Sequence, residues 1–200
     1  MHPEFPLYID QGASFDQTLN WYGGGIFTAR IQRIRKGYPT VFKVTGHGLN
    51  STSPTPVVVS GVEGLKHVNS EDTEISLALP VDADWFTMPV TSVGEKWVKG
   101  TGEITYWKPM NIGGWGGECN IRKNWHSGII LSISTVLGTM VLDGSDGSVQ
   151  LSANPVATGA LDFVGGVYDI DLWPGGGAKP TDGSPIYRIF VGPVIMIRNI

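Results

Sequence analysis

The chain of 200 residues has little cysteine and no long apolar run, and each shortage excludes a class of protein. Cys119 is its single cysteine, so no disulfide can form within the chain. The longest apolar stretch, residues 128–142, is interrupted by Ser, Thr and Gly and is too short to span a bilayer. Residues 1–6 lack the basic and apolar regions of a signal peptide, so we expect a soluble protein made in a cytosol.

Charge is also scarce, at 16% of residues with a net charge of −4. The densest basic run, residues 30–36, is too short to form the basic surface that nucleic-acid-binding proteins use. The histidines are scattered without the spacing of metal ligands, and no nucleophile elbow or phosphate-binding loop is present. We therefore expect no enzymatic activity, no metal, no cofactor and no nucleic-acid partner. His47, between two glycines, is expected to be a turn residue whose ring packs on its own domain.

Glycine and proline are abundant, with 28 and 13 residues. Because both residues break helices, few segments can carry a long helix. The apolar content of 41% is enough for a packed core. The composition therefore predicts an all-β fold.

Residues 167–197 predict an antiparallel hairpin with a long tip. In the first strand apolar residues alternate with Asp169 and Asp171, a pattern typical of a half-buried strand with one wet face. The two carboxylates would lie about 7 Å apart, a spacing compatible with a glycosidase pair. Exposed acids on a polar strand face are the favoured interpretation. Gly192 and Pro193 then predict a bulge or an edge position, because proline cannot donate to the ladder.

A change of pattern at residues 37–39 suggests a domain boundary. Short strands separated by turns follow as far as Lys108, which is typical of a small barrel or sandwich. These strands are expected at residues 40–45, 56–60, 74–79, 85–88 and 103–107. We predict that residues 1–37 and 109–200 form a discontinuous, antiparallel, immunoglobulin-like β-sandwich. Residues 38–108 are predicted to form an inserted β-barrel or β-sandwich module.

The outer part of the chain resembles a family of small β-sandwich proteins found in the tails, baseplates and fibre attachments of tailed bacteriophages. The resemblance lies in the order of several segments: residues 110–122, 128–142, 148–161, 166–172 and 188–194. The insert is similar to another phage tail module at residues 45–49, 60–65 and 81–87. Residues 116–118 are Gly-Gly-Glu where the family has Thr-Ala-Arg, which predicts a bulge in that strand.

This resemblance implies a structural virion protein, made in the cytoplasm of a bacterial host and located in a phage tail. It would act as a baseplate, collar or tail-fibre adaptor through contacts with other virion proteins, in several copies of a symmetric assembly. The alternative is a carbohydrate-binding module that contacts a glycan of the host surface. A small tail hydrolase is disfavoured, because the sequence shows no paired catalytic groups.

Candidate contact residues lie on two loops. Trp125 and Trp173 stand in or beside loops, where exposed aromatic residues mark protein interfaces or sugar platforms. The loop of residues 174–185 has Lys179 and Asp182 as its only charges, and Tyr187 follows it. Loops of this length are usually functional or disordered, so we expect the tip to dock on neighbouring subunits and to become ordered on assembly.

Cys119 lies in a segment whose alternation places it on a buried strand face. No base with the spacing of a catalytic motif is near it. An inert, buried thiol is therefore favoured over a nucleophile.

Overall fold

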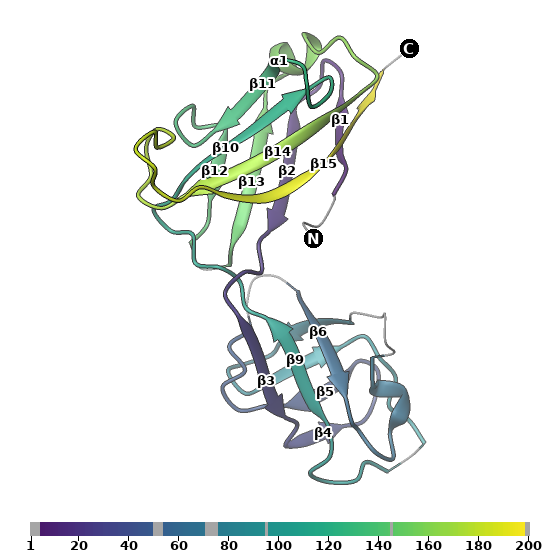
Figure 1. Cartoon of the computed structure of the whole chain (residues 1–200). Helices are drawn as coiled ribbons and strands as arrows, with labels where there is room; N and C mark the ends of the chain where they lie inside the picture. Colours follow the sequence, from purple (N-terminus) through teal and green to yellow (C-terminus); the bar gives the residue numbers. More distant parts are fainter. Residues whose placement is uncertain (1–4, 50–53, 71–75, 95, 145, 199–200) are drawn as a thin grey trace. The chain divides into compact units, whose positions relative to one another are not determined.

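The computed structural model describes residues 5–49, 54–70, 76–94, 96–144 and 146–198 (Figure 1). Within these residues, fifteen strands stand against one short α-helix and one turn of 3-10 helix. The all-β, sandwich-like fold predicted from the composition is confirmed. The chain divides into two compact units, Met1–Trp21 with Met110–Ile200, and Tyr22–Pro109. None of the described helices has the length and apolar character needed to cross a membrane.

The first unit contains two sheets (Figure 1). The larger sheet has the order β1 (Leu7–Asp10), β15 (Tyr187–Ile197), β14 (Gly165–Trp173), β10 (Gly116–Arg122) and β11 (Ile129–Ser134). The smaller sheet has the order β12 (Met140–Leu142), β13 (Ser148–Ala153) and β2 (Phe15–Asn20). All neighbours in these sheets are antiparallel except β1, which runs parallel to β15.

A short helix, α1 (Pro155–Gly159), follows β13. Its start is set by Asn154, whose side-chain oxygen accepts a hydrogen bond from the Ala157 amide at 2.9 Å. A polar residue that caps the first turn, followed by proline at the first helical position, is a common way for a helix to begin.

The hairpin of β14 and β15 supplies much of the core of the first unit. As the alternation predicts, Tyr168, Ile170 and Leu172 are fully buried and belong to this core. Cys119 and Ile121 of the neighbouring strand β10 are buried in the same core. Each large apolar side chain buried in this way stabilises the fold by roughly 1.5–3 kcal/mol relative to an exposed one.

The bulge predicted at residues 116–118 is absent from the ladder between β10 and β14. Their register runs without a shift from Gly116 opposite Trp173 to Arg122 opposite Val167. The glycine at 116 serves close packing instead, since a Cβ there would lie 2.2 Å from the indole nitrogen of Trp173. A shift does occur against β11, between Ile121 and Arg122.

The prediction of an edge position at Gly192 and Pro193 agrees with the strand pairing, whereas the alternative of a bulge at these two residues does not. Pro193 lies opposite Val167 of β14, and the pairing of β15 with β1 begins only at Val194, so the second side of Pro193 has no partner in the ladder. The register shift of this hairpin lies instead between Ile170 and Asp171. The pairing of β1 with the end of β15 could not be predicted from alternation, because the two strands are far apart in the chain.

The second unit is one antiparallel sheet of seven strands around its own core. The order is β3 (Ile26–Arg30), β9 (Glu103–Trp107), β6 (Thr55–Ser60), β7 (Ser76–Pro80), β8 (Trp85–Met88), β5 (Thr40–Lys43) and β4 (Arg33–Arg35). A 3-10 turn, η1 (Lys66–Val68), lies between β6 and β7. The five strands expected in the insert are all present, although residues 74 and 75 lie outside the described residues.

The boundary expected at residue 37 falls inside the second unit, which begins at Tyr22. Strand β3 pairs along its whole length with β9, and β4 pairs with β5. Alternation in a sequence shows which face of a strand is buried, but it does not show which strand lies beside it. The chain returns to the first unit at Met110, beside the expected position 109.

Removal of Tyr22–Pro109 should leave a folded first unit. The Met110 amide donates to the Trp21 carbonyl at 2.9 Å, so the cut ends are already adjacent and a short Gly-Ser linker can join them. Removal of residues 38–108 should instead give an aggregating product, because β3 and β4 would lose their partners. Circular dichroism melting and amide NMR dispersion compare the two proteins. A molten first product, or two equally well-folded products, would contradict these boundaries.

Candidate interaction face on the hairpin sheet

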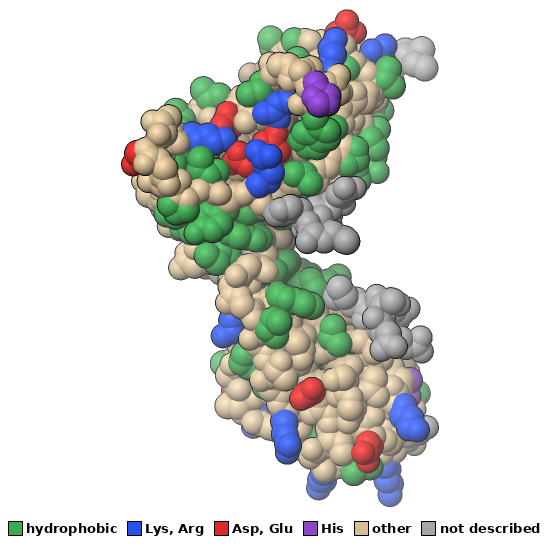
Figure 2. All heavy atoms as spheres, viewed as in Figure 1, with side chains coloured by type: hydrophobic (Ala, Val, Ile, Leu, Met, Phe, Trp, Pro, Cys, Tyr) green, Lys and Arg blue, Asp and Glu red, His purple; other side chains and the backbone are tan. Residues whose placement is uncertain are grey.

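One face of the larger sheet in the first unit carries a cluster of charged side chains. We call this cluster the ionic face, and Figure 2 shows it as adjoining red and blue side chains on the first unit. Its members are Glu118, Arg122, Asp169, Asp171, Lys179 and Arg188. Three carboxylates meet three cations, so the cluster is balanced in charge.

The strand register places these side chains together. Glu118 on β10 is opposite Asp171 on β14, and Asp171 is opposite Arg188 on β15. Residues two apart on one strand share a face, which adds Arg122 and Asp169 to the same side of the sheet. Lys179 comes from the loop between β14 and β15 and folds back onto this face. The ionic face therefore joins three strands and the loop.

Asp169 is covered by two arginines. Its carboxylate accepts a hydrogen bond from Nη1 of Arg122, and Nη2 of Arg188 lies 3.2 Å from its second oxygen. The side chain is 2% exposed. The expectation that this face is wet is therefore wrong, because long cationic side chains lie over the carboxylates and keep water away from them.

Asp171 is held by two cations from different segments. Nε of Arg188 donates to Oδ1 at 2.9 Å, and Nζ of Lys179 donates to Oδ2 at 2.7 Å. Burial alone would raise the pKa of Asp171, but the hydrogen bonds from Arg188 and Lys179 outweigh it and lower this pKa below its ordinary value. The carboxylate is therefore ionised near neutral pH. A glycosidase acid would need the opposite shift.

The hairpin tip, defined as residues 174–186, is fixed by contacts at its base. Lys179 reaches Asp171, and the indole N–H of Trp173 donates to the Gly176 carbonyl at 3.3 Å. Farther along, the Asp182 carboxylate accepts a hydrogen bond from the Ser184 amide at 3.0 Å. The tip therefore makes these contacts within the chain itself, and its docking and ordering on assembly stay a prediction.

Trp173 does not provide the exposed anchor predicted from its position beside the loop. It is 2% exposed, and its ring lies over Gly116, where any side chain would collide with it. The aromatic residue that does reach the surface at this end of the sheet is Tyr187, which is 43% exposed. The glycine at position 116 could have indicated that Trp173 is buried, but only if the pairing of β10 with β14 had been known.

Tyr187 belongs to a group of three aromatic rings, the aromatic trio. Its ring centroid lies 5.5 Å from that of Trp115 and 6.3 Å from that of Trp21, and the two tryptophans are 6.0 Å apart, edge to face. Both tryptophans pack against the core of the first unit. The trio therefore supports an exposed tyrosine beside the hairpin tip. Reasoning from the sequence identified Tyr187 but missed its two partners.

Trp125 is exposed as predicted, with 52% of its surface accessible. It lies in the loop after β10, whose turn is fixed by the Asn124 carboxamide accepting from the His126 amide at 2.9 Å. This loop follows Arg122, whereas Trp173 and the hairpin tip adjoin the opposite end of β10 at Gly116. Lys179, Asp182 and Tyr187 therefore lie in or directly beside the connection between β14 and β15, whereas Trp125 follows the other end of β10.

Cys119 is fully buried on the core side of β10, as the alternation predicts. Burial raises the pKa of this thiol, and the nearby negative charges of Asp169 and Glu118 raise it further. The thiol is therefore protonated and inert. Within the described residues, no group of three or more His, Cys, Asp or Glu side chains is placed to hold a metal ion.

No protein-family model and no curated protein sequence matches this chain.

The variant Asp171→Asn should lower the free energy of unfolding by about 1–3 kcal/mol at neutral pH, because Arg188 and Lys179 lose a buried charged acceptor. The folded pKa of Asp171 is depressed, so its contribution is present above the ordinary value near 3.8 and is lost as pH falls through the lower folded value. The difference between wild type and variant should therefore shrink in strong acid.

Urea unfolding of both proteins across a pH series measures this difference. Asp10→Asn is the matched control, because Asp10 is exposed at the end of β1 and its replacement should change stability by less than about 0.5 kcal/mol. A difference for Asp171→Asn that stays constant down to acid pH would contradict the ionised, cation-held carboxylate.

Proposed function

We propose that this protein is a structural component of a tailed bacteriophage virion, associated with the tail as a baseplate, collar or tail-fibre adaptor. It acts through contacts with other virion subunits. The observation that carries this proposal is the exposed hairpin tip, held over the ionic face by the ion pair of Lys179 with Asp171. The resemblance of its segment order to that of phage tail proteins supports this kind of assembly.

The hairpin tip has the properties of a protein-binding element. Its base is fixed by Lys179 and Trp173, so a partner would meet a loop that has already lost much of its conformational freedom. At its end Ile186 is 40% exposed, next to the exposed edge of Tyr187. A partly exposed aromatic residue with rigid support is a frequent centre of binding energy in protein interfaces.

The state of the ionic face favours a structural role over catalysis. A tail hydrolase needs a carboxyl group that exchanges its proton near neutral pH. Asp169 and Asp171 are instead paired with arginine and lysine, and the pKa of Asp171 is lowered. Through these ion pairs the two carboxylates connect three strands and the hairpin tip, which is a structural role.

The second candidate function is a carbohydrate-binding module for a glycan on the host surface. It is favoured by the exposed indole of Trp125, since sugars stack on exposed aromatic faces. This function would use the loop after β10 rather than the hairpin tip.

Complementation of a phage that lacks this gene separates the two functions. The variant Ile186→Lys places a charge on the hairpin tip and should reduce the occupancy of the protein in purified particles by about tenfold or more. Val141→Lys is the matched control, because Val141 is similarly exposed on β12 in the other sheet and should leave occupancy unchanged. Melting curves verify that both variants fold.

Complete, infectious particles with normal occupancy of Ile186→Lys would contradict the hairpin tip as an assembly contact. Normal particle assembly combined with lost host adsorption in Trp125→Ala would favour the carbohydrate-binding function.

A further inference from the structure

One part of the sheet in the second unit carries cations that no acid accompanies. Residues 17–62 include five lysine and arginine residues and no aspartate or glutamate. Three of these cations, Arg33 and Arg35 on β4 and Lys43 on β5, lie on the solvent side of their strands, as does Trp85 on the neighbouring strand β8. We call these four residues the basic face.

Strand pairing brings the members of the basic face together. Arg33 is opposite Lys43, and Lys43 is opposite Trp85. The intervening residues Phe42 and Phe86 point into the core, where their rings stack with 5.3 Å between centroids. Because side chains alternate between the two sides of a strand, the basic face lies on the side away from this core.

Two cations converge on the indole of Trp85. The guanidinium carbon of Arg35 lies 4.0 Å from the ring centroid, and Nζ of Lys43 lies 5.7 Å from it. Among the described residues, no carboxylate forms an ion pair with Arg33, Arg35 or Lys43. Like charges this close repel one another, and an anion between them would relieve the repulsion. The indole also holds the guanidinium in place, so its N–H groups are already positioned for a carboxylate.

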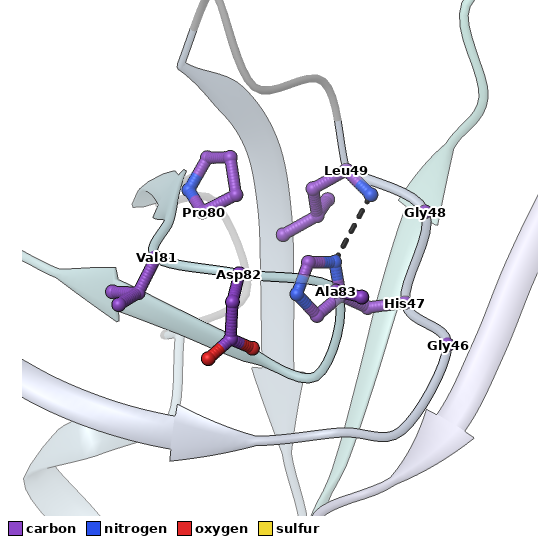
Figure 3. Close-up of a pocket in the computed structure, with 8 residues that line it drawn as sticks. All are labelled: Gly46, His47, Gly48, Leu49, Pro80, Val81, Asp82 and Ala83. Atoms are coloured by element: carbon purple, nitrogen blue, oxygen red, sulfur yellow. Dashed lines mark hydrogen bonds between the residues drawn. The ribbon is translucent and has the colours of Figure 1, made fainter.

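The two acids in the turn before Trp85 do not neutralise this charge. The Asp82 carboxylate accepts hydrogen bonds from the amides of Asp84 and Trp85 at 2.8 and 2.9 Å. The Asp84 carboxylate accepts one from the Gly46 amide at 3.1 Å. Figure 3 shows Asp82 in this turn, which lines a pocket of about 420 Å³ together with the loop of residues 46–49. Both acids thus hold the backbone of the turn and the loop, and the basic face keeps its positive charge.

Beside the basic face the same side of the sheet is apolar. Val41 on β5 is opposite Thr87 on β8, which is opposite Leu79 on β7. Leu79 is 49% exposed. Arginine and tryptophan next to apolar surface are the side chains that protein interfaces favour.

Charge complementarity therefore requires an acidic partner, and the arrangement favours a protein segment over a nucleic acid. Proteins that bind nucleic acids tightly neutralise more phosphates than three cations can, and they stack bases on open aromatic faces. Here the guanidinium of Arg35 already lies over the Trp85 indole. A phosphate backbone also offers Leu79 no apolar contact. An extended polypeptide, in contrast, presents carboxylates and an apolar side chain on one side when they occupy alternate positions.

We propose that the basic face binds an extended, acidic segment of a partner protein. One carboxylate of the segment pairs with Arg35 and Lys43 above Trp85, a second carboxylate pairs with Arg33, and an apolar side chain rests on Leu79. This assignment goes beyond the proposed function, because it concerns the second unit and does not depend on the contacts of the hairpin tip.

Amide NMR titration of the full chain with a short peptide tests the proposal. The peptide carries two glutamates and a leucine at alternate positions, and it is compared with the same peptide containing glutamine for glutamate and with a short oligothymidylate. The acidic peptide should shift the amides of β4, β5 and β8 in a saturable manner. The glutamine peptide should bind more weakly by about tenfold or more, because it cannot form the charged hydrogen bonds.

The variant Arg35→Met keeps an apolar side chain beside Trp85 but removes the charge, so it should weaken binding of the acidic peptide by about tenfold. Lys99→Met is the matched control, because Lys99 is an exposed cation of the same unit outside the basic face and its loss should leave binding unchanged. Melting curves check that both variants are folded.

Three results would overturn the proposal. The first is the absence of saturable shifts with the acidic peptide. The second is equal binding of the glutamine peptide, or equal binding of the acidic peptide by Arg35→Met. The third is tighter binding of oligothymidylate, which would assign the basic face to a nucleic acid instead.

Discussion

The interaction on which the first unit depends is the pairing of the buried Asp171 carboxylate with Arg188 and Lys179. A buried carboxylate is costly unless cations and hydrogen bonds surround it, and removal of one partner destabilises the rest. A slip of β14 by one residue would carry Asp171 into the apolar core, so this pairing also specifies the strand register. The position of the hairpin tip follows from the same contact, because Lys179 belongs to that loop.

Much of the fold could be predicted from the sequence where the information is local. The alternation around Tyr168 and Ile170 correctly gave the buried face of β14. The burial of Asp169 could not be predicted, because the side chain that covers it, Arg122, comes from another strand. The assignment of β3 to the wrong unit has the same cause, since its partner β9 lies far along the chain.

The candidate sites were harder to predict than the fold, because the environment of each residue is set by residues from other strands and loops. Trp173 is buried because Gly116 has no side chain to exclude it. His47 packs on its own unit as its sequence context indicated, but its partner Phe86 could not be identified without the folded arrangement. Tyr187 was identified from its place beside a loop, whereas its support by Trp21 and Trp115 required the folded arrangement.

The parallel pairing of β1 with β15 has a mechanical consequence. Residues Leu7 to Asp10 are in register with Val194 to Ile197, and the two strands run in the same direction. Tension applied between the segment before β1 and the segment after β15 therefore pulls the strands past one another along their length. In that shear geometry the backbone hydrogen bonds of the ladder bear the load together rather than breaking one at a time. The first unit is thus built to resist stretching along this axis.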